Sequence, residues 1–529
     1  MDVAAGNAPD QTEAIAFLSA PESYGSPVNA VLTRQTHGAI VFLAGDRAYK
    51  LKRAVRYPYM DYSTVALRRA MCEAELAVNR RTAPDLYLEV RPLVRRPGGA
   101  IGFGTRDDAD RSIDWVVVMR RFAESDLFEE MRKRGALTGS LARQLADAIA
   151  TFHARAEIRT DFGGSQGLAA VVDENVNLLR SLAGRPFEAQ QVADYTAAVR
   201  AEFERCKPLL EKRRHEGHVR RCHGDLHLNN ICLFNGKPTL FDAIEFSEDF
   251  SIIDTGYDLA FLLMDLEHHG GRDLANEVAN RYLERSGDYG MLAALPLFLS
   301  CRAALRAHIA ATLAEKDAAR AAPLRKEACA LLKDAGSFLR TGPAVLCAIS
   351  GLSGTGKSVL AHALAPGVGR APGAVLLRSD VLRKQLRGSA ETERLPEAAY
   401  APAAKALVYE TMAARARAIL ETGHSVIVDA VFGREPERRL IARIARETGA
   451  RFIPLWLEAP AATLRCRVAQ RRGDASDATV AVLEKQLGSI EPPVDWQRID
   501  ASGSPEETLQ KARGATGLLS GAGEEPSPA

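Results

Sequence analysis

The stretch RRCHGDLHLNNICLFNGKPTLFDAIEF, residues 220–246, places three oxygen-bearing side chains at short intervals. Asp225 follows a glycine, Asn230 comes later in the same loop, and Asp242 follows twelve residues after Asn230. Between them, ICLF and TLFD flank the turn NGK, which predicts a β-hairpin. This pattern meets the needs of phosphoryl transfer, because Asp225 can accept a hydroxyl proton while Asn230 and Asp242 can hold Mg²⁺.

The same stretch contains two cysteines and two histidines, which raises the alternative of a zinc cluster. The four candidate ligands are Cys222, His223, His227 and Cys232. Zinc sites commonly use spaced pairs such as CxxC or HxxxH. Cys222 and His223 are adjacent and no such pair repeats, so the spacing argues against zinc.

HGDLHLNN, with the later FDAIEF, closely resembles the aminoglycoside phosphotransferase and choline kinase branch of the kinase-like fold. The resemblance spans about 25–335 and implies an α+β protein-kinase-like fold that uses ATP and Mg²⁺. It implies that Asp225 is the catalytic base, that Asn230 and Asp242 are metal ligands, and that His227 organises the loop.

An upstream β-hairpin fits the same resemblance. AIVFLA (39–44), the turn GD and the alternating RAYKLKR (47–53) predict its two strands. By the resemblance, Lys50 on the returning strand anchors the nucleotide phosphates. Lys52 stays an alternative, because strand alternation places both lysines on one face.

A helix is expected over about 64–81, followed by a buried strand at WVVVM (115–119). By the resemblance, Glu75 on the helix pairs with the lysine, with Glu73 as the alternative. The strand is expected to meet adenine, with Met119 nearby. The expected match is incomplete, because THG (36–38) supplies only one glycine where a Gly-rich loop would cover the phosphates.

A second phosphate-binding pattern begins after the apolar strand AVLCAIS (344–350). GLSGTGKS (351–358) fits G-x-x-x-x-G-K-[ST], and a helix-compatible VLAHALA follows it. Glycines let backbone N–H groups turn toward phosphate oxygens, and the helix N-terminus adds a favourable dipole. The residues expected to bind the nucleotide are Gly351, Gly354, Gly356, Lys357, Ser358 and Val359, with Ser358 also a ligand of Mg²⁺.

Acidic and basic residues further along are expected to complete this second site. Asp429 ends the strand SVIVDA (425–430), where an acid that organises Mg²⁺ belongs. Asp380, just past the strand LLRSD, could accept a hydroxyl proton, and Arg383 could hold the acceptor. The alternatives are a turn-capping Asp429, and an N-capping Asp380 beside a solvated Arg383.

Arg467 and Arg471 are four residues apart and are expected to share a helix face. Such a face could close over the transferring phosphoryl group as an arginine lid. The alternative is a solvated basic face in an Arg-rich chain.

Residues from about 340 to 512 resemble the P-loop kinases of small hydroxyl acceptors, the grouping near gluconate kinase, polynucleotide 5′-kinases and zeta-toxin-like kinases. GLSGTGKS, SD-x-x-R, VIVDA and R-x-x-x-R carry this resemblance. Strand–helix alternation predicts an α/β fold with a parallel sheet covered on both faces.

The order of the two halves resembles a bacterial family of fused, bifunctional aminoglycoside phosphotransferase/ATP-binding proteins. TRQTHGAIVFLAGDRAYKLKRAV and CEAELAVNRR also fit that family. We therefore expect a kinase-like domain over 25–340 and a P-loop domain over 341–513. Residues 1–24 are expected to form a weakly ordered leader, and 514–529 a disordered tail.

Composition limits the remaining classes of function. The 529 residues include 69 Lys and Arg and 67 Asp and Glu, a net charge of +2. Near neutrality counts against nucleic acid as the partner, and we expect a small-molecule hydroxyl acceptor. The acidic, polar N-terminus and the lack of a long apolar run predict a cytoplasmic protein that does not span a membrane.

Three functions are compatible with these patterns. The first is a tandem enzyme in which both halves phosphorylate hydroxyl groups. The second is one catalytic half with an ATP-binding regulatory half, and the third is a toxin- or polynucleotide-type kinase. No motif names the acceptor or the oligomeric state.

Overall fold

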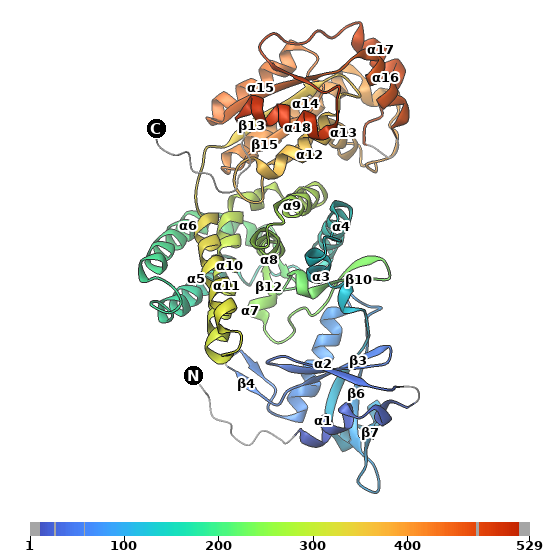
Figure 1. Ribbon diagram of the computed structural model, residues 1–529, viewed down its shortest axis with the longest axis vertical. Coiled ribbons are helices and arrows are strands. Elements are labelled where there is room, and N and C mark those ends of the chain that lie inside the picture. Colours follow the sequence, from blue (N-terminus) through green and yellow to red (C-terminus); the bar gives the residue numbers. More distant parts are fainter. Residues whose placement is uncertain (1–10, 26–27, 58, 472–474, 518–529) are drawn as a thin grey trace. The chain divides into compact units, whose positions relative to one another are not determined.

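The computed structural model of the chain describes residues 11–25, 28–57, 59–471 and 475–517, and its contacts divide the chain into two compact units (Figure 1). Unit 1 comprises Met1–Asp265 and Cys301–Ala328, and unit 2 comprises Leu266–Ser300 and Cys329–Ala529. The units interleave along the sequence, which differs from the single predicted boundary at 340–341.

A six-stranded antiparallel sheet forms the N-terminal part of unit 1, in the order β1-β2-β3-β8-β6-β7. Its strands are β1 (Val31–Gln35), β2 (Ala39–Ala44), β3 (Arg47–Lys52), β6 (Tyr87–Arg95), β7 (Ile101–Phe103) and β8 (Ser112–Arg120), and a separate short pair consists of β4 (Arg56–Tyr57) and β5 (Met60–Asp61). The predicted hairpin at 39–53 is β2 and β3, which pair from Ala39 with Lys52 to Ala44 with Arg47.

Both faces of this sheet are covered, which explains why the run WVVVM within β8 is apolar throughout. Val117 and Met119 point into a cluster with α2 (Val65–Asn79), whereas Val116 and Val118 point into a cluster with α1 (Thr12–Ser19). Successive strand side chains alternate between faces, so a strand buried on both sides reads as a continuous apolar run.

Helix α1 corrects the expectation of a weakly ordered leader for residues 11–24. Ala14 and Leu18 are one helical turn apart, and both are buried against the sheet. Just before the helix, Gln11 Nε2 donates to the backbone oxygen of Lys52 at 2.9 Å and to Asp114 Oδ2 at 2.6 Å. Residues 1–10 lie outside the described part.

The remainder of unit 1 is mainly helical, with two short antiparallel strand pairs that frame the loop after Arg221. The helices are α3 (Phe128–Lys133), α4 (Gly139–Arg155), α5 (Gly164–Ser181), α6 (Ala189–His215), α7 (Glu248–Ser251) and α8 (Thr255–His268), and the strand pairs are β9 (Val219–Arg221) with β12 (Ile252–Asp254) and β10 (Ile231–Phe234) with β11 (Lys237–Leu240). The β10–β11 hairpin is the one predicted from ICLF, NGK and TLFD.

Unit 2 contains a five-stranded parallel sheet in the order β14-β15-β13-β16-β17. The strands are β13 (Val345–Gly351), β14 (Val375–Arg378), β15 (Val426–Asp429), β16 (Arg451–Glu458) and β17 (Gln497–Asp500). Its helices are α12 (Lys357–Leu364), α13 (Ser379–Gln385), α14 (Pro402–Glu421), α15 (Glu435–Thr448), α16 (Ala461–Gln470), α17 (Val480–Leu487) and α18 (Pro505–Thr516). The alternation of these strands and helices confirms the predicted α/β class for this half.

A helix from the part of the sequence predicted to be the kinase-like domain covers the edge of this sheet. In α9 (Arg272–Ser286), Asn276 and Asn280 donate from their amide nitrogens to the backbone oxygen of Ala374, at 3.1 and 3.2 Å. Asn280 Oδ1 accepts from the backbone N–H of Leu376 at 2.7 Å. The amides thus pair polar groups that an edge strand leaves open, which is why this segment belongs to unit 2.

Three helices contain residues of both units: α8, α10 (Leu295–Lys316) and α11 (Ala321–Phe338). In the described residues α10 alone has the length and hydropathy of a membrane span, and 72% of its apolar window is buried within the protein. Such burial is typical of a core helix. Helix α18 extends to Thr516, beyond the predicted start of a disordered tail at 514, and residues 518–529 lie outside the described part.

Candidate active sites

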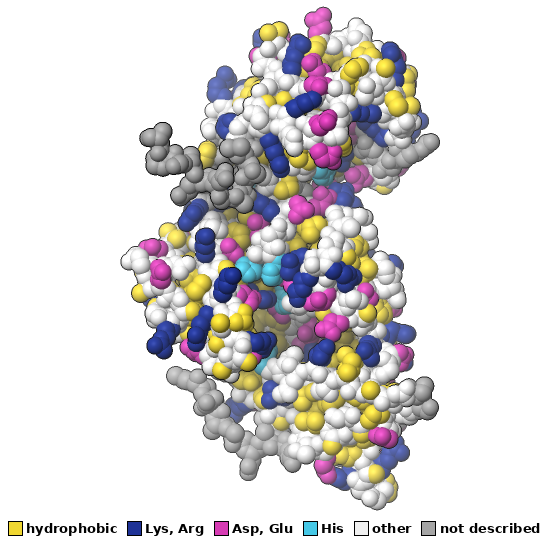
Figure 2. All heavy atoms as spheres, viewed as in Figure 1, with side chains coloured by type: hydrophobic (Ala, Val, Ile, Leu, Met, Phe, Trp, Pro, Cys, Tyr) yellow, Lys and Arg dark blue, Asp and Glu magenta, His cyan; other side chains and the backbone are white. Residues whose placement is uncertain are grey.

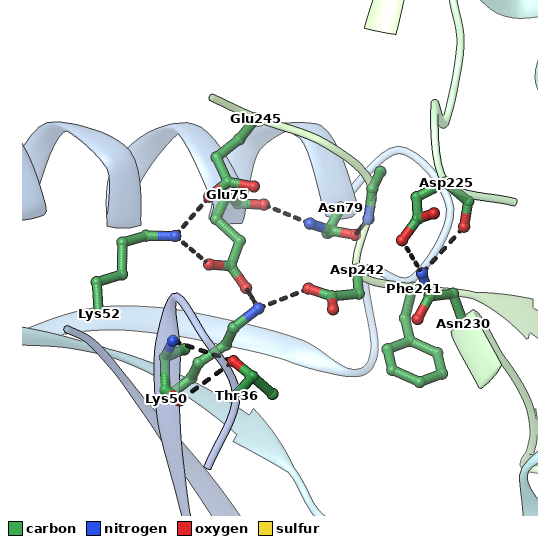
Figure 3. Close-up of polar contacts among 12 residues, drawn as sticks. Thr36, Lys50, Lys52, Glu75, Asn79, Asp225, Asn230, Phe241, Asp242 and Glu245 are labelled. Atoms are coloured by element: carbon green, nitrogen blue, oxygen red, sulfur yellow. Dashed lines mark hydrogen bonds and ion pairs between the residues drawn. The ribbon is translucent and has the colours of Figure 1, made fainter. Parts of the chain in front are cut away.

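Two lysines on one face of β3 reach the same carboxylate on α2 (Figure 3). Lys50 Nζ lies 2.8 Å from Glu75 Oε1, and Lys52 Nζ lies 2.7 Å from Glu75 Oε2. Residues two apart on a strand share a face, so AYKLK places both ammonium groups toward α2. Burial alone would raise the pKa of Glu75, but the two ammonium charges lower it to about 2.

The two lysines differ in their second partner. Lys50 Nζ lies 2.5 Å from Oδ1 of the predicted metal ligand Asp242, whereas Lys52 Nζ lies 2.5 Å from Glu245 Oε1. The Lys50 side chain is 16% exposed and that of Lys52 only 2%. Of the two lysines that the sequence left open, Lys50 therefore has the position suited to phosphate, and Lys52 lies behind it.

The structure also separates the two candidate glutamates. Glu73 pairs with Arg69 at the surface, where the distance between Arg69 Nε and Glu73 Oε1 is 3.2 Å and both side chains are 44% exposed. Two residues along a helix turn a side chain through about 200°, so only Glu75 faces the sheet.

The loop that begins at His223 holds Asp225 and Asn230 against each other. Asn230 Nδ2 donates to Asp225 Oδ2 at 2.8 Å and to the backbone oxygen of Asp225 at 2.9 Å. His227 Nε2 lies 3.4 Å from Asp225 Oδ2. Burial acts to raise the pKa of Asp225, but the neighbouring His227 imidazole outweighs it and holds the pKa well below its ordinary value. Asp225 is thus a charged carboxylate with a set orientation.

A buried carboxylate on α8 shapes the start of this loop. Asp258 accepts the backbone N–H of His223 at 3.0 Å and that of Gly224 at 2.8 Å, and it lies 3.0 Å from His153 Nε2. Gly224 has φ +85°, and a Cβ there would lie 2.6 Å from the backbone oxygen of Phe250. The glycine of HGD is therefore required by the backbone.

Backbone contacts also hold Asp242 in an uncommon conformation. Its φ is +62°, its N–H donates to the hydroxyl of Tyr87 at 3.1 Å, and the N–H of Ala243 donates to Asn79 Oδ1 at 2.8 Å. Non-glycine residues with positive φ concentrate at functional sites, where neighbouring contacts maintain them. These contacts direct Asp242 toward Lys50.

The oxygen donors of this loop region suit Mg²⁺. The amide nitrogen of Asn230 is occupied by Asp225, which leaves its amide oxygen as an acceptor, and Asp242 supplies a half-exposed carboxylate. Magnesium prefers carboxylate and carbonyl oxygens. The predicted ligands Asn230 and Asp242 therefore fit the ion chemically.

The zinc alternative has little support among the described residues. The one cluster of metal-binding side chains found there is His153, Cys222 and Asp258, which is not the set that the sequence raised. Both Asp258 oxygens already accept hydrogen bonds from backbone N–H groups. Burial raises the pKa of Cys222 well above its ordinary value, so its thiol stays protonated.

Met119 lies near the end of β8, in the apolar cluster between the sheet and α2. The same cluster includes Cys232 of β10 and Phe241, the neighbour of Asp242. Met119 is thus placed on the side of the sheet that carries the site, and its contact with adenine stays a prediction.

In unit 2, GLSGTGKS forms a turn between β13 and α12. Gly351 has φ +140°, and a Cβ there would lie 2.5 Å from the backbone oxygen of Leu457. Gly356 has φ +87° immediately before α12 begins at Lys357. The glycines thus allow close packing and a left-handed turn, which aim the first N–H groups of the helix outward as an anion site.

Parallel pairing brings the predicted metal ligands of this half together. Asp429 ends β15, which pairs with β13 so that Ile349 lies opposite Asp429. Ser358 Oγ on the following helix donates to Asp429 Oδ2 at 2.5 Å. The carboxyl ends of parallel strands meet at one sheet edge, so residues 71 apart form one site.

A cavity of about 620 Å³ opens beside the phosphate loop. Its lining combines the predicted nucleotide residues Gly354, Gly356, Lys357, Ser358 and Val359 with Asp380, Arg383, Asp429 and Arg471. The volume is within the range of ligand-binding pockets. The structure therefore gathers most of the residues predicted for this half around one space.

Asp380 and Arg383 lie in the first turns of α13. Burial raises the pKa of Asp380 above its ordinary value, although a hydrogen bond from Ser476 and the charge of Arg383 act in the opposite direction. Arg383 is 8% exposed, donates from Nη1 to the backbone oxygen of Ala399 at 3.2 Å and stacks over the ring of Tyr400 at 4.8 Å. A carboxyl with a raised pKa beside a cavity is a candidate for a catalytic base.

The proposed arginine lid needs a correction. Arg467 Nη1 donates to the backbone oxygen of Ala501 at 2.8 Å, and its Nη2 donates to that of Gly503 at 3.0 Å. Helix α16 ends at Gln470, and Arg471 has an extended backbone. The two arginines therefore do not share a helix face, and only Arg471 lines the cavity.

Reasoning from sequence missed three contributors to these sites. Glu245 pairs with Lys52 and follows Asp242 by three residues. Its closeness to Asp242 in the sequence was the only indication of a role in the site. Asp477 accepts from Tyr400 Oη at 2.5 Å and pairs with Lys384, so it joins two walls of the cavity. The role of α9 in unit 2 has no local sequence signal, because it depends on contacts between residues that are about 100 positions apart in the chain.

Comparison with known proteins matches both halves. The family described as "Phosphotransferase enzyme family" matches residues 61–295, and the family described as "AAA domain" matches residues 346–493. The uncharacterized protein Rv2004c of Mycobacterium tuberculosis is 30% identical over 490 residues, which cover 90% of this chain and 94% of that protein. The uncharacterized protein Mb2027c of Mycobacterium bovis gives the same identity and coverage.

Solved structures of similar proteins fall into two groups. A choline/ethanolamine kinase family protein from Mesorhizobium loti has 18% identity and a TM-score of 0.37, covering 62% of this chain and 99% of that one. A gluconokinase from Sinorhizobium meliloti 1021 has 22% identity and a TM-score of 0.24, covering 34% of this chain and 95% of that one. The two family matches and the 30% identity to Rv2004c over 90% of this chain show that the chain belongs to a family of fused proteins, in which a kinase-like half of the phosphotransferase enzyme family precedes a P-loop kinase-like half.

Proposed function

We propose that the protein is a phosphotransferase with two Mg·ATP sites, each of which transfers the γ-phosphoryl group to a hydroxyl group of a small molecule. One observation supports this most directly: each unit gathers a lysine, two oxygen ligands for Mg²⁺ and a carboxylate that can act as a base. The sets are Lys50, Asn230, Asp242 and Asp225 in unit 1, and Lys357, Ser358, Asp429 and Asp380 in unit 2.

In unit 1, Asp225 accepts the proton of the acceptor hydroxyl. The acceptor oxygen forms a bond to the γ-phosphorus while the bond from that phosphorus to the β–γ bridging oxygen breaks, and ADP leaves. The bonds from Asn230 keep Asp225 oriented for this step. Mg²⁺, held by Asn230 and Asp242, would neutralise phosphate charge. Lys50, now 2.5 Å from Asp242, would turn to the phosphate oxygens.

In unit 2, the backbone N–H groups at the start of α12 and the ammonium group of Lys357 would bind the phosphates. Lys357 Nζ now contacts the backbone oxygen of Leu352 at 3.0 Å, a neutral partner that phosphate can replace. Asp380 would accept the acceptor proton, and Arg383 would hold the acceptor. Arg471, which lines the cavity, would approach the transferring group.

Surface charge supports a small acceptor over a nucleic acid. Figure 2 shows Lys and Arg side chains interspersed with Asp and Glu on the visible face. With a net charge of +2, the chain lacks the excess of basic residues that backbone binding to nucleic acid requires. We therefore propose a small-molecule acceptor for both halves, in a cytoplasmic protein that has access to ATP.

Mass spectrometry of phosphorylated metabolites tests the proposal. Purified protein is incubated with Mg·ATP and a bacterial metabolite extract, beside Asp225→Asn and Lys357→Ala. Each variant is expected to lose a different phosphorylated product. Lys357→Ala should also weaken ATP binding in unit 2 by roughly 10- to 150-fold, because it removes a charged hydrogen bond to phosphate.

Loss of the same product from both variants would instead mean that the halves act in series or that one half regulates the other. If the wild type binds ATP but no metabolite gains phosphate, the small-molecule proposal is wrong. A repeat with single-stranded RNA that carries a free 5′-hydroxyl group then tests the polynucleotide-type alternative.

The pH dependence of the P-loop half offers a separate prediction. A base must be deprotonated to act, so turnover falls as pH drops through the raised pKa of Asp380. The acid limb is therefore expected above the value of about 4 of an ordinary aspartate. Initial rates of the product that depends on Lys357 are measured from pH 4 to 8. Asp380→Asn should abolish this limb together with most of the rate, and an unshifted limb would contradict the assignment.

A further inference from the structure

Helix α9 lies inside the stretch that matches the phosphotransferase family, yet it belongs to unit 2. Besides the amides that cover β14, this helix directs a charged side chain toward the P-loop half. Arg281 Nη1 lies 2.8 Å from Glu391 Oε2 and 3.2 Å from Glu284 Oε2. The Arg281 side chain is 15% exposed and that of Glu391 25%, so this pair is largely shielded from water.

A series of alternating charges continues from this pair to the predicted metal site. The other oxygen of Glu391, Oε1, lies 3.5 Å from Arg378 Nη1, and Arg378 Nε lies 3.8 Å from Asp429 Oδ2. The side chains of Arg378 and Asp429 are 9% and 7% exposed. Asp429 Oδ2 also accepts the hydroxyl of Ser358 at 2.5 Å. A hydrogen bond from Ser358 and a longer charge contact with Arg378 therefore act on the same oxygen of the Asp429 carboxylate, and the second contact leads back to α9.

We infer that Arg281 is a positioning residue for the Mg²⁺ site of the P-loop half. The inference rests on the proposed function, in which Ser358 and Asp429 bind the ion. Glu391 lies between the guanidinium groups of Arg281 and Arg378 and forms an ion pair with each. Without Arg281, Arg378 is the remaining guanidinium of this pair that attracts Glu391. The Arg378 guanidinium is therefore drawn toward Glu391 and away from Asp429. Asp429 then loses the contact that complements Ser358.

A second contact from the same helix supports this role for α9. The backbone oxygen of Glu284 accepts from Gln385 Nε2 at 3.1 Å, and Gln385 Oε1 accepts from Arg415 Nη1 at 2.9 Å. Gln385 is the last residue of α13, the helix that carries Asp380 and Arg383. One end of α9 is therefore linked to Asp429 indirectly, through Glu391 and Arg378. The same end directly contacts α13, the helix with the candidate base. The P-loop half is completed by sequence from the phosphotransferase half.

Calorimetry of ATP binding by the full chain tests the inference. Titrations with ATP are run in EDTA and in Mg²⁺, and the site whose ATP affinity is weakened in Lys357→Ala is taken as the P-loop site. Arg281→Met is expected to reduce the Mg²⁺-dependent gain in ATP affinity at that site by about tenfold, the lower end for residues that support metal ligands. ATP affinity in EDTA should not change, because the phosphate loop is intact.

Three variants make the result specific. Arg281→Lys keeps the charge and should recover most of the lost gain. Arg285→Met changes an exposed arginine one turn further along α9 and should match the wild type. If a thermal unfolding scan shows that Arg281→Met does not fold, Arg281→Gln replaces it, because glutamine keeps a polar side chain. The Mg²⁺-dependent gain in ATP affinity is then measured for Arg281→Gln.

The outcomes are distinguishable. An unchanged Mg²⁺-dependent gain in Arg281→Met, or an equal loss of affinity in EDTA and in Mg²⁺, would overturn the positioning role. If the wild type itself shows no Mg²⁺-dependent gain at the site that Lys357→Ala weakens, the proposed Mg²⁺ site fails, and the inference fails with it.

Discussion

Asp225→Asn is expected to lower the turnover of the N-terminal half by roughly 10²- to 10⁴-fold, the usual contribution of a general base. Asparagine keeps the size of the side chain and can still contact Asn230, but it cannot accept the acceptor proton. ATP affinity should change little, because Asp225 acts on the acceptor and only in the transition state. The check is the rate of formation of the product that depends on this half, together with ATP binding by calorimetry.

A matched control is Asp161→Asn, at an aspartate whose side chain is 68% exposed and pairs with Arg159 at the surface. This variant should keep the wild-type rate. If Asp225→Asn retains more than about a tenth of the rate, a general-base role of the expected size is ruled out. If it loses ATP binding as well, the variant has disturbed the loop and the test must move to Asp225→Ser.

Glu75→Ala is expected to destabilise unit 1 by about 3–5 kcal/mol, because it removes one partner of a buried ionic network. Glu75 is fully buried between two ammonium groups, and Lys52 is only 2% exposed. Deleting the carboxylate leaves Lys50 and Lys52 to repel each other, with Asp242 and Glu245 as their remaining partners. The free energy of unfolding is measured by denaturant titration, with separate transitions assigned to the two units.

The pKa of Glu75 adds an acid-dependent test of the same contact. A carboxyl whose pKa falls to about 2 on folding stabilises the protein above its ordinary pKa, and this contribution is lost as pH falls toward about 2. Glu75→Ala should therefore flatten the acid dependence of stability between about pH 4.5 and pH 2.

Glu73→Ala is the control for this substitution on the same helix. Its pair with Arg69 is half exposed, and such surface pairs contribute about 0–1 kcal/mol. A loss of stability from Glu73→Ala as large as that from Glu75→Ala would mean that the buried network does not account for the effect of Glu75→Ala.

Local pattern was sufficient for most strands and for the two signature loops. AIVFLA, WVVVM and AVLCAIS are continuous apolar runs and form β2, β8 and β13, because a strand buried on both faces has no polar positions. HGDLHLNN and GLSGTGKS combine glycines, which permit tight backbone turns, with the side chains that the chemistry needs. Because these side chains are closely spaced in the chain, the sequence alone identifies them as candidate site residues.

Local pattern failed where a second element decided the outcome. The leader was expected to be weakly ordered, but Leu18 has a sheet face to bury against. Strand alternation places Lys50 and Lys52 on the same face, so the sequence does not show which of them anchors phosphate. Only the positions of Asp242 and Glu245 distinguish the two lysines. The spacing of Arg467 and Arg471 indicated one helix face, but α16 ends between them. For the leader and the two lysines, the deciding contacts come from residues distant in the chain.

The sequence by itself determined the two kinase-like halves, the phosphate loop and the candidate acids, because each depends on backbone and side-chain chemistry within a few residues. Only the tertiary structure decided which lysine faces the site, which arginine lines the cavity and where unit 2 begins. Asn276, Asn280 and Arg281 belong by sequence to the first half, but their partners are backbone groups at β14 and Glu391 in the second. Hydrogen bonds and charge pairs of that kind depend on proximity in space, which no local pattern encodes.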